Sequence, residues 1–411
     1  MHGIREHESL IFHACILCGY SNMSSRARWN NKMTSKERKQ KRYERRKAKR
    51  EKRRKDAIGK YDSFDNAISL DSLYKAAIMT RHGVGWKVSV KRFHITLMKH
   101  IWRLHEDLIK GKDIRKGFIV FYVVERGKKR KIMSVHYNER VVQKALCQST
   151  LYPIFTRSLI HDNGASQKGK GTSFALKRLS IHLRRHIHRH GREGGILLID
   201  FKDYFGNVDH QTLHKLYEHM VQDKKLRELL WLFVEAFGDK GLGLGSETSQ
   251  LNAIVFRNRP DHYAKEVLRI KGYAGYMDDT YLIHEDIGYL KECLKKLKEV
   301  YESMGIVINE KKTKICDLKH GFTFLKTRFC ITETGHIIKK PCRDAITRER
   351  RKLKKQVGLL NEGKLTANEI RISYASWRGS MKEKDAYKTV RNMDVLYNKQ
   401  IIKEWRYQGN G

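Results

Sequence analysis

The feature of this chain that most constrains its fold is a pair of adjacent acids inside an apolar, aromatic segment. Residues 272–281 read Gly-Tyr-Ala-Gly-Tyr-Met-Asp-Asp-Thr-Tyr, and Leu282 and Ile283 follow. Acids are poor strand formers and the flanking residues are good ones, so the pattern predicts a tight hairpin with Asp278 and Asp279 at its tip. Carboxylates this close repel each other unless a cation lies between them. Mg²⁺ prefers a few carboxylates plus substrate phosphates, so the segment predicts a magnesium-binding hairpin.

A second acidic motif lies upstream, at the end of a short apolar run. Residues 196–199, Ile-Leu-Leu-Ile, are typical of a buried strand, and Asp200 follows directly. Sheets of mixed folds place their chemistry at strand ends, so we expect Asp200 to lie near the hairpin. Asp200, Asp278 and Asp279 would then hold two Mg²⁺ ions about 3.5–4 Å apart, as nucleotidyl transfer requires. The alternative for an Asp-Asp pair alone is an ordinary solvated turn, which the second motif disfavours.

The two motifs together resemble those of the reverse transcriptases. Tyr276-Met277-Asp278-Asp279 matches their catalytic hairpin, and Asp200 to Phe205 matches their preceding motif, with an aromatic residue five positions after the acid. The resemblance covers roughly residues 60–385. It implies an α+β right-hand polymerase with fingers, a palm built on an antiparallel sheet and a helical thumb. It also implies RNA-directed DNA synthesis with two Mg²⁺ ions, Mn²⁺ being the alternative metal.

Composition and periodicity divide the chain into four regions. Residues 1–56 form a basic N-terminal extension, in which residues 26–55 hold 17 Lys and Arg against three Glu. We interpret this stretch as a solvated basic helical arm that follows phosphates without reading bases, a solubilising or targeting tail being the alternative. Residues 57–195 are predicted to form the fingers, residues 196–332 the palm with the catalytic motifs, and residues 333–411 the helical thumb and C-terminal tail.

Hydrophobic periodicity also predicts individual elements. Strands are expected at 117–124, 127–136, 196–199 and 322–331, and helices within 66–111 and at 139–149, 210–221, 224–237 and 289–304. After Pro341 the chain becomes basic and helical.

Charge and cysteine content bound the class of protein. The 411 residues carry a formal net charge of +41, which implies a polyanionic partner, with nucleic acid first. Seven scattered cysteines give no disulfide framework, and no apolar stretch approaches the ~20 residues of a membrane span, so we expect a cytoplasmic protein without membrane contact. His13, Cys15 and Cys18 are metal-ligand types, but no second pair follows at zinc-finger spacing.

The resemblance assigns roles around the incoming nucleotide. Phe205 is the expected steric gate, whose ring would exclude a ribose 2′-hydroxyl, with ordinary core packing as the alternative. Lys128 and Arg130 align with the basic pair that clamps the triphosphate, where cations offset developing charge. Phe201 is placed among the metal- and nucleotide-binding residues.

A glycine-rich loop, residues 241–250, lies between the two acidic motifs. Its position matches the reverse-transcriptase element that contacts template and nucleotide, which adds Leu244 and Gly245 to the nucleotide site. Most such enzymes have Gln where this chain has Leu244, and an aliphatic residue there resembles the diversity-generating retroelement enzymes. Because Leu cannot hydrogen-bond the nucleotide as Gln can, we hypothesise low fidelity. Gly243 departs from the Pro common to both groups.

Further residues are assigned to catalysis or to the template and primer. Lys312 resembles the lysine of the next family motif and would protonate leaving pyrophosphate as a general acid, with a solvated surface lysine as the alternative. The residues expected at the template and primer are Ser249, Gln250, Lys168, Lys170, Tyr276, Met277, Phe324 and Leu325. In this set Lys168 follows Gln167 where the family usually has Arg-Pro, and Lys326 replaces a usual Gly.

The resemblance also implies partners and leaves the biological role open. The partners are an RNA template, a DNA or RNA primer and dNTPs, with a structured non-coding RNA and a small accessory protein as further candidates. A diversity-generating retroelement, an anti-phage reverse transcriptase and a retron-type enzyme all fit, and the Leu244 pattern favours the first. A group II intron-like maturase is disfavoured, because it would need DNA-binding or endonuclease segments after the thumb. An RNA-dependent RNA polymerase and a non-catalytic RNA-binding protein are the rival functions.

Overall fold

The computed structural model describes residues 34–125 and 127–408, without the side chains of Glu125, Lys128 and residues 401–408. The chain divides into two compact units, residues 1–56 and 57–411. Helix α1 (Ser35–Tyr61) starts in the first unit, where all its described side chains are exposed, as predicted for a basic solvated helix. Thr34 and Glu37 bond each other's backbone N–H groups at its start, which forms a capping box. The predicted ligands His13, Cys15 and Cys18 lie outside the described residues.

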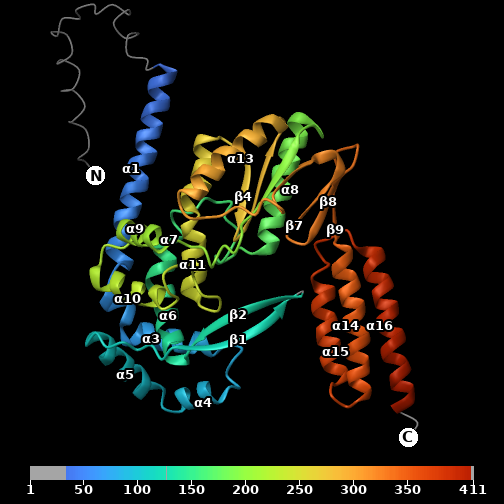
Figure 1. The fold of residues 1–411 in the computed structure, drawn as a ribbon, viewed down its shortest axis with the longest axis horizontal. Helices are drawn as coiled ribbons and strands as arrows, with labels where there is room; N and C mark the ends of the chain where they lie inside the picture. The colour runs from blue at the N-terminus through green and yellow to red at the C-terminus, as the bar shows by residue number, and fades with distance from the viewer. Residues whose placement is uncertain (1–33, 126, 409–411) are drawn as a thin grey trace, which may run out of the picture. The chain divides into compact units, whose positions relative to one another are not determined.

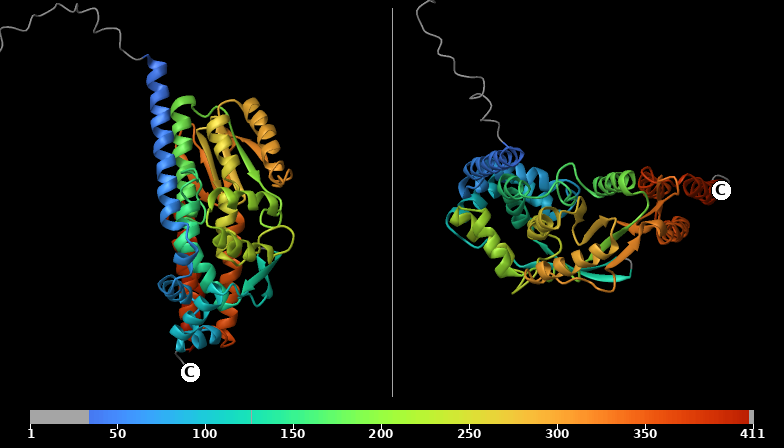
Figure 2. Two further views of the ribbon diagram at one scale, coloured as in Figure 1. Left: turned by 90° about the vertical axis from the view of Figure 1, so that its left-hand side faces the viewer. Right: turned by 90° about the horizontal axis from the view of Figure 1, so that it is seen from above.

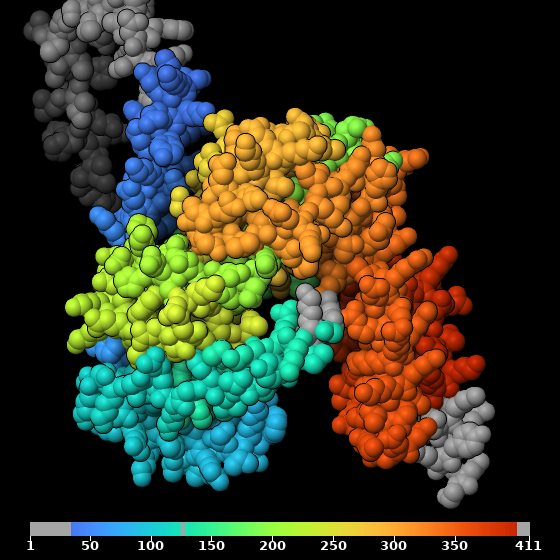
Figure 3. All heavy atoms as spheres, viewed as in Figure 1, coloured from blue at the N-terminus to red at the C-terminus, as the bar shows by residue number. Residues whose placement is uncertain are grey.

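The N-terminal part of the second unit is a helical layer that carries one hairpin (Figure 1). The helices are α2 (Phe64–Ile68), α3 (Leu70–Arg81), α4 (Val88–Ile95), α5 (Leu97–Ile109), α6 (Tyr137–Leu146), η1 (Cys147–Leu151) and α7 (Tyr152–Phe155). Strands β1 (Phe118–Glu125) and β2 (Lys128–Val135) pair only with each other, antiparallel. The apolar run of β1 is largely exposed, with Val124 at 70%, and the hairpin lies at the surface in Figure 3.

A four-stranded antiparallel sheet in the order β4-β5-β3-β6 forms the centre of the second unit. Its strands are β3 (Gly195–Asp200), β4 (Gly272–Tyr276), β5 (Asp279–His284) and β6 (Lys314–Asp317). Alternation along β3 divides two cores. Leu198 belongs to the same buried cluster as Leu179 of α8 (Thr172–His190), whereas Leu197 belongs to the same cluster as Leu297 of α13 (Ile287–Glu302). Helices α8 and α13 therefore cover opposite faces of the sheet (Figure 2).

A second group of helices joins the sheet to the N-terminal layer. These are α9 (His210–Met220), α10 (Lys224–Glu235), α11 (Glu247–Phe256), α12 (Asn258–His262) and η2 (Tyr263–Val267). Asp209 and Asp223 cap α9 and α10 by accepting the N–H groups of Thr212 and Leu226. Residues of α6 and α11 share one buried cluster with β3, so the regions predicted as fingers and palm have a continuous core.

The C-terminal part has its own sheet and its own small core. Strands β7 (Phe322–Phe324), β8 (Thr327–Ile331) and β9 (Ile337–Pro341) follow the short η3 (Leu318–His320). Three helices follow, α14 (Arg343–Asn361), α15 (Ala367–Gly379) and α16 (Tyr387–Gln408), packed around Tyr374, Trp377 and Met393. Because β9 pairs with β8, this sheet runs across position 332, where the sequence predicts the end of the palm.

The predicted strands and helices are confirmed with shifted ends, except that the strand expected over 322–331 is two antiparallel strands, β7 and β8, separated by the positive-φ turn at Leu325 and Lys326. The helix expected from residue 289 starts at Ile287, because the Asp286 side chain accepts the N–H groups of Gly288 and Tyr289. The helix expected over 139–149 begins at Tyr137 and widens after Leu146 into the π-type turn η1. The α+β class is confirmed, with 58% helix and 15% strand. Within the described residues, no helix has the length and apolar character needed to cross a bilayer.

Candidate active site

The acid pair lies on a two-residue hairpin, as the sequence predicts. Strand β4 ends at Tyr276, β5 begins at Asp279, and these two residues face each other across the turn. Asp278 is exposed in the turn, and Met277 has a φ of +52°, a left-handed conformation that tight hairpin turns require. A side chain at positive φ is strained, so surrounding contacts must hold Met277 there.

Asp200 lies directly opposite Asp279, because β3 and β5 are neighbours and these residues are register partners. This proximity affects the pKa of Asp279. Burial, and then the charges of Asp278 and Asp200, raise the pKa of this carboxyl to about 7. Both neighbouring acids therefore lie close enough to Asp279 to disfavour its charged form.

Lys312 and Asn309 bind the first of these acids. The Lys312 ammonium lies 2.9 Å from both carboxylate oxygens of Asp200, and the Asn309 amide donates to one of them at 3.0 Å. The Asp200 side chain is 17% exposed and that of Lys312 is 53% exposed. Lys312 thus supplies positive charge to a cluster that otherwise holds three acids.

The three carboxylates are suitable ligands for a hard divalent cation, although they are not arranged as a complete coordination site. Across the described ranges, no group of three or more His, Cys, Asp or Glu side chains converges closely enough to hold a metal. Carboxylate oxygens are the ligands that Mg²⁺ prefers, and a cation would relieve the repulsion that raises the Asp279 pKa. The residues therefore fit Mg²⁺ by their chemistry, and the ammonium of Lys312 forms an ion pair with Asp200.

A buried arginine that sequence reasoning missed anchors the hairpin. Arg257 and Asp261 are completely buried and paired, with Nε of Arg257 3.0 Å from Asp261 Oδ1. The Arg257 guanidinium donates to the Met277 carbonyl in the turn, and at 2.7 Å to the hydroxyl of Thr280 on β5. These bonds hold the strained turn. The only signal in the sequence is a charged residue directly after the apolar run of α11.

Gly275 makes room for this arginine. A Cβ atom built on Gly275 would lie 2.2 Å from an Arg257 guanidinium nitrogen, so no side chain fits at this point of β4 unless Arg257 moves. The glycine lies two residues before the turn and is required by packing rather than by its backbone angles.

The predicted nucleotide-binding residues lie on segments that hydrogen-bond to each other. The Leu242 N–H donates to the Phe205 carbonyl at 2.7 Å, and the Met133 N–H of β2 donates to the Leu244 carbonyl at 3.1 Å. The glycine-rich loop thereby links the second acidic motif to the fingers hairpin. Phe205 is half-buried with its ring edge-on to Tyr204, while the Phe201 side chain is buried at 3% exposure, so only its backbone can face a ligand.

The unusual Gly243 has a steric cause in this chain. A Cβ atom at this position would lie 1.9 Å from the ring of Phe237, which is stacked on Phe118 of β1. The departure from the family's Pro therefore accompanies an aromatic ring that occupies the space of a side chain. Gly245 has a φ of +117° and is exposed next to β2.

Two predicted template residues, Lys168 and Gln250, line one cavity of about 780 Å³ between helices α3 and α6 and the glycine-rich loop. Gly245, from the predicted nucleotide site, lines the same cavity. The Lys168 ammonium lies 5.1 Å from the Tyr152 ring centre. Ser249, by contrast, is buried at 1% exposure, and its hydroxyl has no hydrogen-bond partner in the described structure.

The remaining predicted residues have structural roles that the sequence did not show. The Lys170 ammonium donates to the carbonyls of His161 and Asn163, which closes its own loop. The hydroxyl of Tyr276 lies 3.2 Å from that of Thr172. Phe324 is buried edge-on to Tyr281, and Leu325 occupies the positive-φ turn between β7 and β8 together with Lys326.

Of the two residues predicted to bind the triphosphate, Lys128 and Arg130, the structure describes the side chain of Arg130 only. Arg130 is exposed on β2 opposite Val123. The backbone of Lys128 starts β2, but its side chain lies outside the described part of the structure. The triphosphate role of both residues stays a prediction.

The family can now be stated. The model of the reverse transcriptase (RNA-dependent DNA polymerase) family matches residues 110–329, more than half of the chain, and the chain belongs to this family. The predicted fold, a right-hand polymerase of α+β class, is confirmed. Among curated proteins, no sequence matches the chain.

Similar solved structures include yeast telomerases, at low identity. The telomerase of Candida albicans in complex with a fragment of telomeric RNA has a TM-score of 0.43 at 12% identity, over 62% of this chain and 55% of that chain. The apo telomerase of Candida tropicalis has a TM-score of 0.42 at 12% identity, over 75% and 64%. A form of the latter truncated from its C-terminal domain has a TM-score of 0.41 at 13% identity, over 54% and 55%. The chain thus spans less than two thirds of each of these proteins.

Proposed function

We propose that the protein copies an RNA template into DNA by two-metal nucleotidyl transfer, with Asp200, Asp278 and Asp279 as metal ligands. The observation that carries the proposal is the cross-strand pairing of Asp200 with Asp279 beside the Asp278 turn. Two Mg²⁺ ions bound there would supply activation of a primer 3′-hydroxyl and charge stabilisation of the leaving pyrophosphate. Phe201 is the proposed backbone ligand beside them.

The protein's own residues would orient the other reactants. Phe205, next to the acids in sequence, would exclude a ribose 2′-hydroxyl and select dNTPs. Lys128 and Arg130 would bind the triphosphate, as their place on the fingers hairpin allows. Lys312, which forms an ion pair with Asp200, would donate a proton to the leaving pyrophosphate. Leu244 and Gly245 would form the apolar wall of the nucleotide site.

The proposed role is that of a retroelement enzyme of the diversity-generating type. The aliphatic Leu244 followed by Ser249-Gln250 supports it, and low fidelity remains a prediction that goes with it. Anti-phage and retron-type reverse transcription are the alternatives. A template repeat beside a variable-gene repeat in the neighbouring DNA would favour the first role, and a gene for a structured non-coding RNA would favour the others.

The test of the activity is extension of oligo(dT) on poly(rA) with Mg²⁺ by the wild-type protein and by Asp279→Asn. Loss of one metal-binding carboxylate should lower the rate by about 10³-fold or more. Asp239→Asn is the matched control, because Asp239 is exposed and has no ion-pair partner in the described structure. Equal rates for wild type and Asp279→Asn would refute the proposal. A preference for NTPs over dNTPs would instead indicate an RNA-dependent RNA polymerase.

A further inference from the structure

A second cavity, of about 750 Å³, lies at the other end of the palm sheet from the catalytic hairpin. It opens where β4 begins at Gly272 and β5 ends at His284, whereas the hairpin joins the opposite ends of these strands. Its walls are α8 and the segment from Lys265 to Lys271. Nothing in the proposed polymerase chemistry uses this end of the sheet.

The cavity is lined by more positive than negative charge. Helix α8 contributes one continuous face, since residues three, four and seven positions apart lie on the same side of a helix. The cations that line the cavity are Arg178, Arg185, Arg189, Lys265, Arg269 and Lys271, and the acids are Asp162 and Glu285. Four histidines complete the wall.

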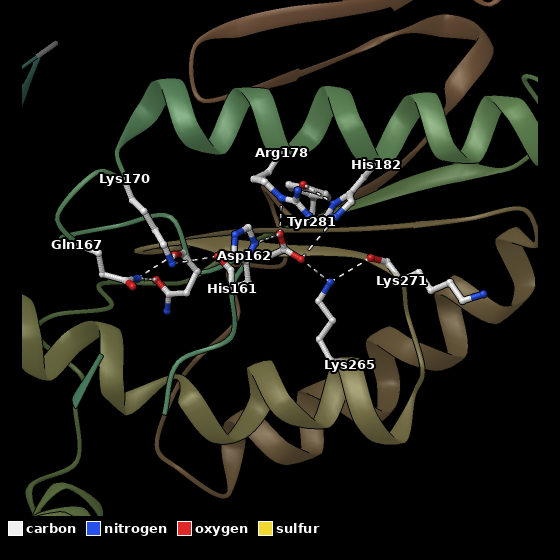
Figure 4. A network of polar contacts seen from close by, with 10 residues as sticks. His161, Asp162, Gln167, Lys170, Arg178, His182, Lys265, Lys271 and Tyr281 are labelled. Carbon is white, nitrogen blue, oxygen red and sulfur yellow. Dashed lines mark hydrogen bonds and ion pairs between the residues drawn. The ribbon is translucent and has the colours of Figure 1, made fainter. Parts of the chain in front are cut away.

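One of the two acids is already saturated by a buried network (Figure 4). Asp162 accepts a hydrogen bond from Arg178 at 2.6 Å and another from Lys265 at 2.8 Å, and His182 lies 3.5 Å away. The other ring nitrogen of His182 lies 2.9 Å from the hydroxyl of Tyr281 on β5. The side chains of Asp162 and His182 are 8% and 3% exposed, so the floor of the cavity is preorganised.

The remaining cations have no acid to neutralise them. In the described ranges, no hydrogen bond or ion pair engages the side chains of Arg185, Arg189, Arg269 or Lys271. The second acid, Glu285, lies instead beside two histidines, 3.8 Å from His190 and 3.7 Å from His284. A concave surface with four uncompensated cations attracts a polyanion, and guanidinium forks match phosphate oxygens.

The lining also indicates which part of a nucleic acid would enter. The only non-histidine, uncharged residues in the wall are Gly272 and Ile283, so there is no Phe, Tyr or Trp platform on which bases would stack. Contacts from Arg and Lys to phosphate oxygens position a nucleic acid and carry no sequence information. The cavity is also larger than a single phosphate group requires, since volumes of this order accommodate drug-sized ligands.

We propose that this cavity binds the phosphate backbone of a folded RNA, as an anchoring site separate from the polymerase cleft. The site holds RNA whether or not that RNA is being copied, so it does not depend on the proposed polymerase activity. Arg185 and Arg189, one turn apart on α8, make the main contacts from one wall, and Arg269 and Lys271 make them from the other.

The test is binding of a fluorescently labelled stem-loop RNA to the full-length protein, measured by anisotropy over a range of salt concentrations. The variant Arg185→Glu/Arg189→Glu should bind about tenfold more weakly or worse, with the slope of log affinity against log salt reduced by about 1–2. The matched control is Lys291→Glu/Lys295→Glu, which makes the same charge change on two exposed lysines of α13, on the other face of the sheet. The control should lose less than about threefold.

Three readouts keep the outcomes distinct. Equal losses in the two double variants would overturn the proposal, because they would show a general charge effect. Site-dependent binding of inositol hexakisphosphate without site-dependent binding of the RNA would also overturn it, in favour of a small phosphoanion. Unchanged melting temperatures and an unchanged kcat on saturating poly(rA)·oligo(dT) in the site variant support it, and an enzyme inactive on that substrate would refute only the polymerase proposal.

Discussion

Two buried carboxylates, Asp261 and Asp162, bind cations beside β4 in different ways. Asp261 pairs with Arg257 in a site with no solvent access. Other N–H groups of this arginine donate to Met277 and Thr280 at the Asp278 turn. Asp162 binds Arg178 and Lys265 at the floor of an open cavity that carries additional cations. Asn163 connects the two, since its amide lies 3.3 Å from Asp261 and its backbone follows that of Asp162.

The difference is one of charge balance. In the Arg257 site one cation meets one acid, so there is no net charge left to attract a ligand, and the guanidinium serves geometry alone. In the Asp162 site the cations exceed the acids, so the network is stable and still attracts anions. A buried ion pair that is balanced positions a chain, whereas one with excess charge on its solvent side also creates a binding surface.

The largest expected effect comes from breaking the balanced pair. Arg257→Met leaves Asp261 buried without its cation and releases the Met277 turn, so stability should fall by about 3–5 kcal/mol. The polymerase kcat should fall with little change in KM, because Arg257 positions the hairpin and does not touch substrate. Urea unfolding and steady-state primer extension measure the two effects.

A double variant separates stability from positioning at this pair. Arg257→Met/Asp261→Asn removes both buried charges, so it should recover much of the lost stability without restoring kcat, since the bond to the Met277 carbonyl is still missing. If the double variant regained full activity, Arg257 would be a folding residue only.

The acidic motifs could be predicted from the sequence because the residues that identify each motif are adjacent in the chain. Asp278 and Asp279 are contiguous, and Asp200 directly ends an apolar strand, so local patterning was enough. Arg257 could not be predicted in this way, because its role depends on contacts with Met277 and Thr280, which are 20 and 23 positions away. Gly275 is explained only through that same contact.

The residues assigned by resemblance differ in the same way: their place along the chain follows from the sequence, whereas their contacts do not. The backbone links from Leu244 to Met133 and from Phe205 to Leu242 agree with one shared site, as family position suggested. Lys170 lies in the predicted region, but its ammonium is held by two carbonyl oxygens of its own loop, a detail that depends on the loop's path. The cationic cavity was missed because its cations come from α8 and from a turn some 80–90 residues later along the chain.

A third buried carboxylate, Glu139, extends the comparison, because no cation in the described part of the structure forms a hydrogen bond or ion pair with it. It is 3% exposed and accepts a single hydrogen bond, from the Gln143 amide at 2.9 Å. Burial raises its pKa from 4.5 to about 7. The folded protein therefore holds a proton that the unfolded chain releases, and stability should fall as pH rises from about 4.5 to 7.

Glu139→Gln should remove this pH dependence. The amide keeps an oxygen for Gln143 and carries no charge, so the variant should be more stable than wild type by up to about 3 kcal/mol above pH 7 and equal to it near pH 4. Urea unfolding of both proteins at about pH 5 and about pH 8 measures the difference. A stability difference independent of pH would show that Glu139 stays charged in the folded protein.

The smallest effect on stability should come from Asp162, and it separates the two kinds of network. Asp162→Asn removes the charge that binds Arg178 and Lys265, but both cations border a solvent-filled cavity and can hydrate, so the loss should be about 1–2 kcal/mol. The same change makes the cavity more positive, so affinity for a stem-loop RNA should rise by roughly two- to fivefold at low salt. Stability and binding would then change in opposite directions.

Arg257→Met should lower stability without raising RNA affinity, since its site has no opening to solvent. A loss of RNA affinity in Asp162→Asn, measured by anisotropy in protein confirmed to be folded, would mean that the acid organises the ligand itself rather than only neutralising the floor of the cavity.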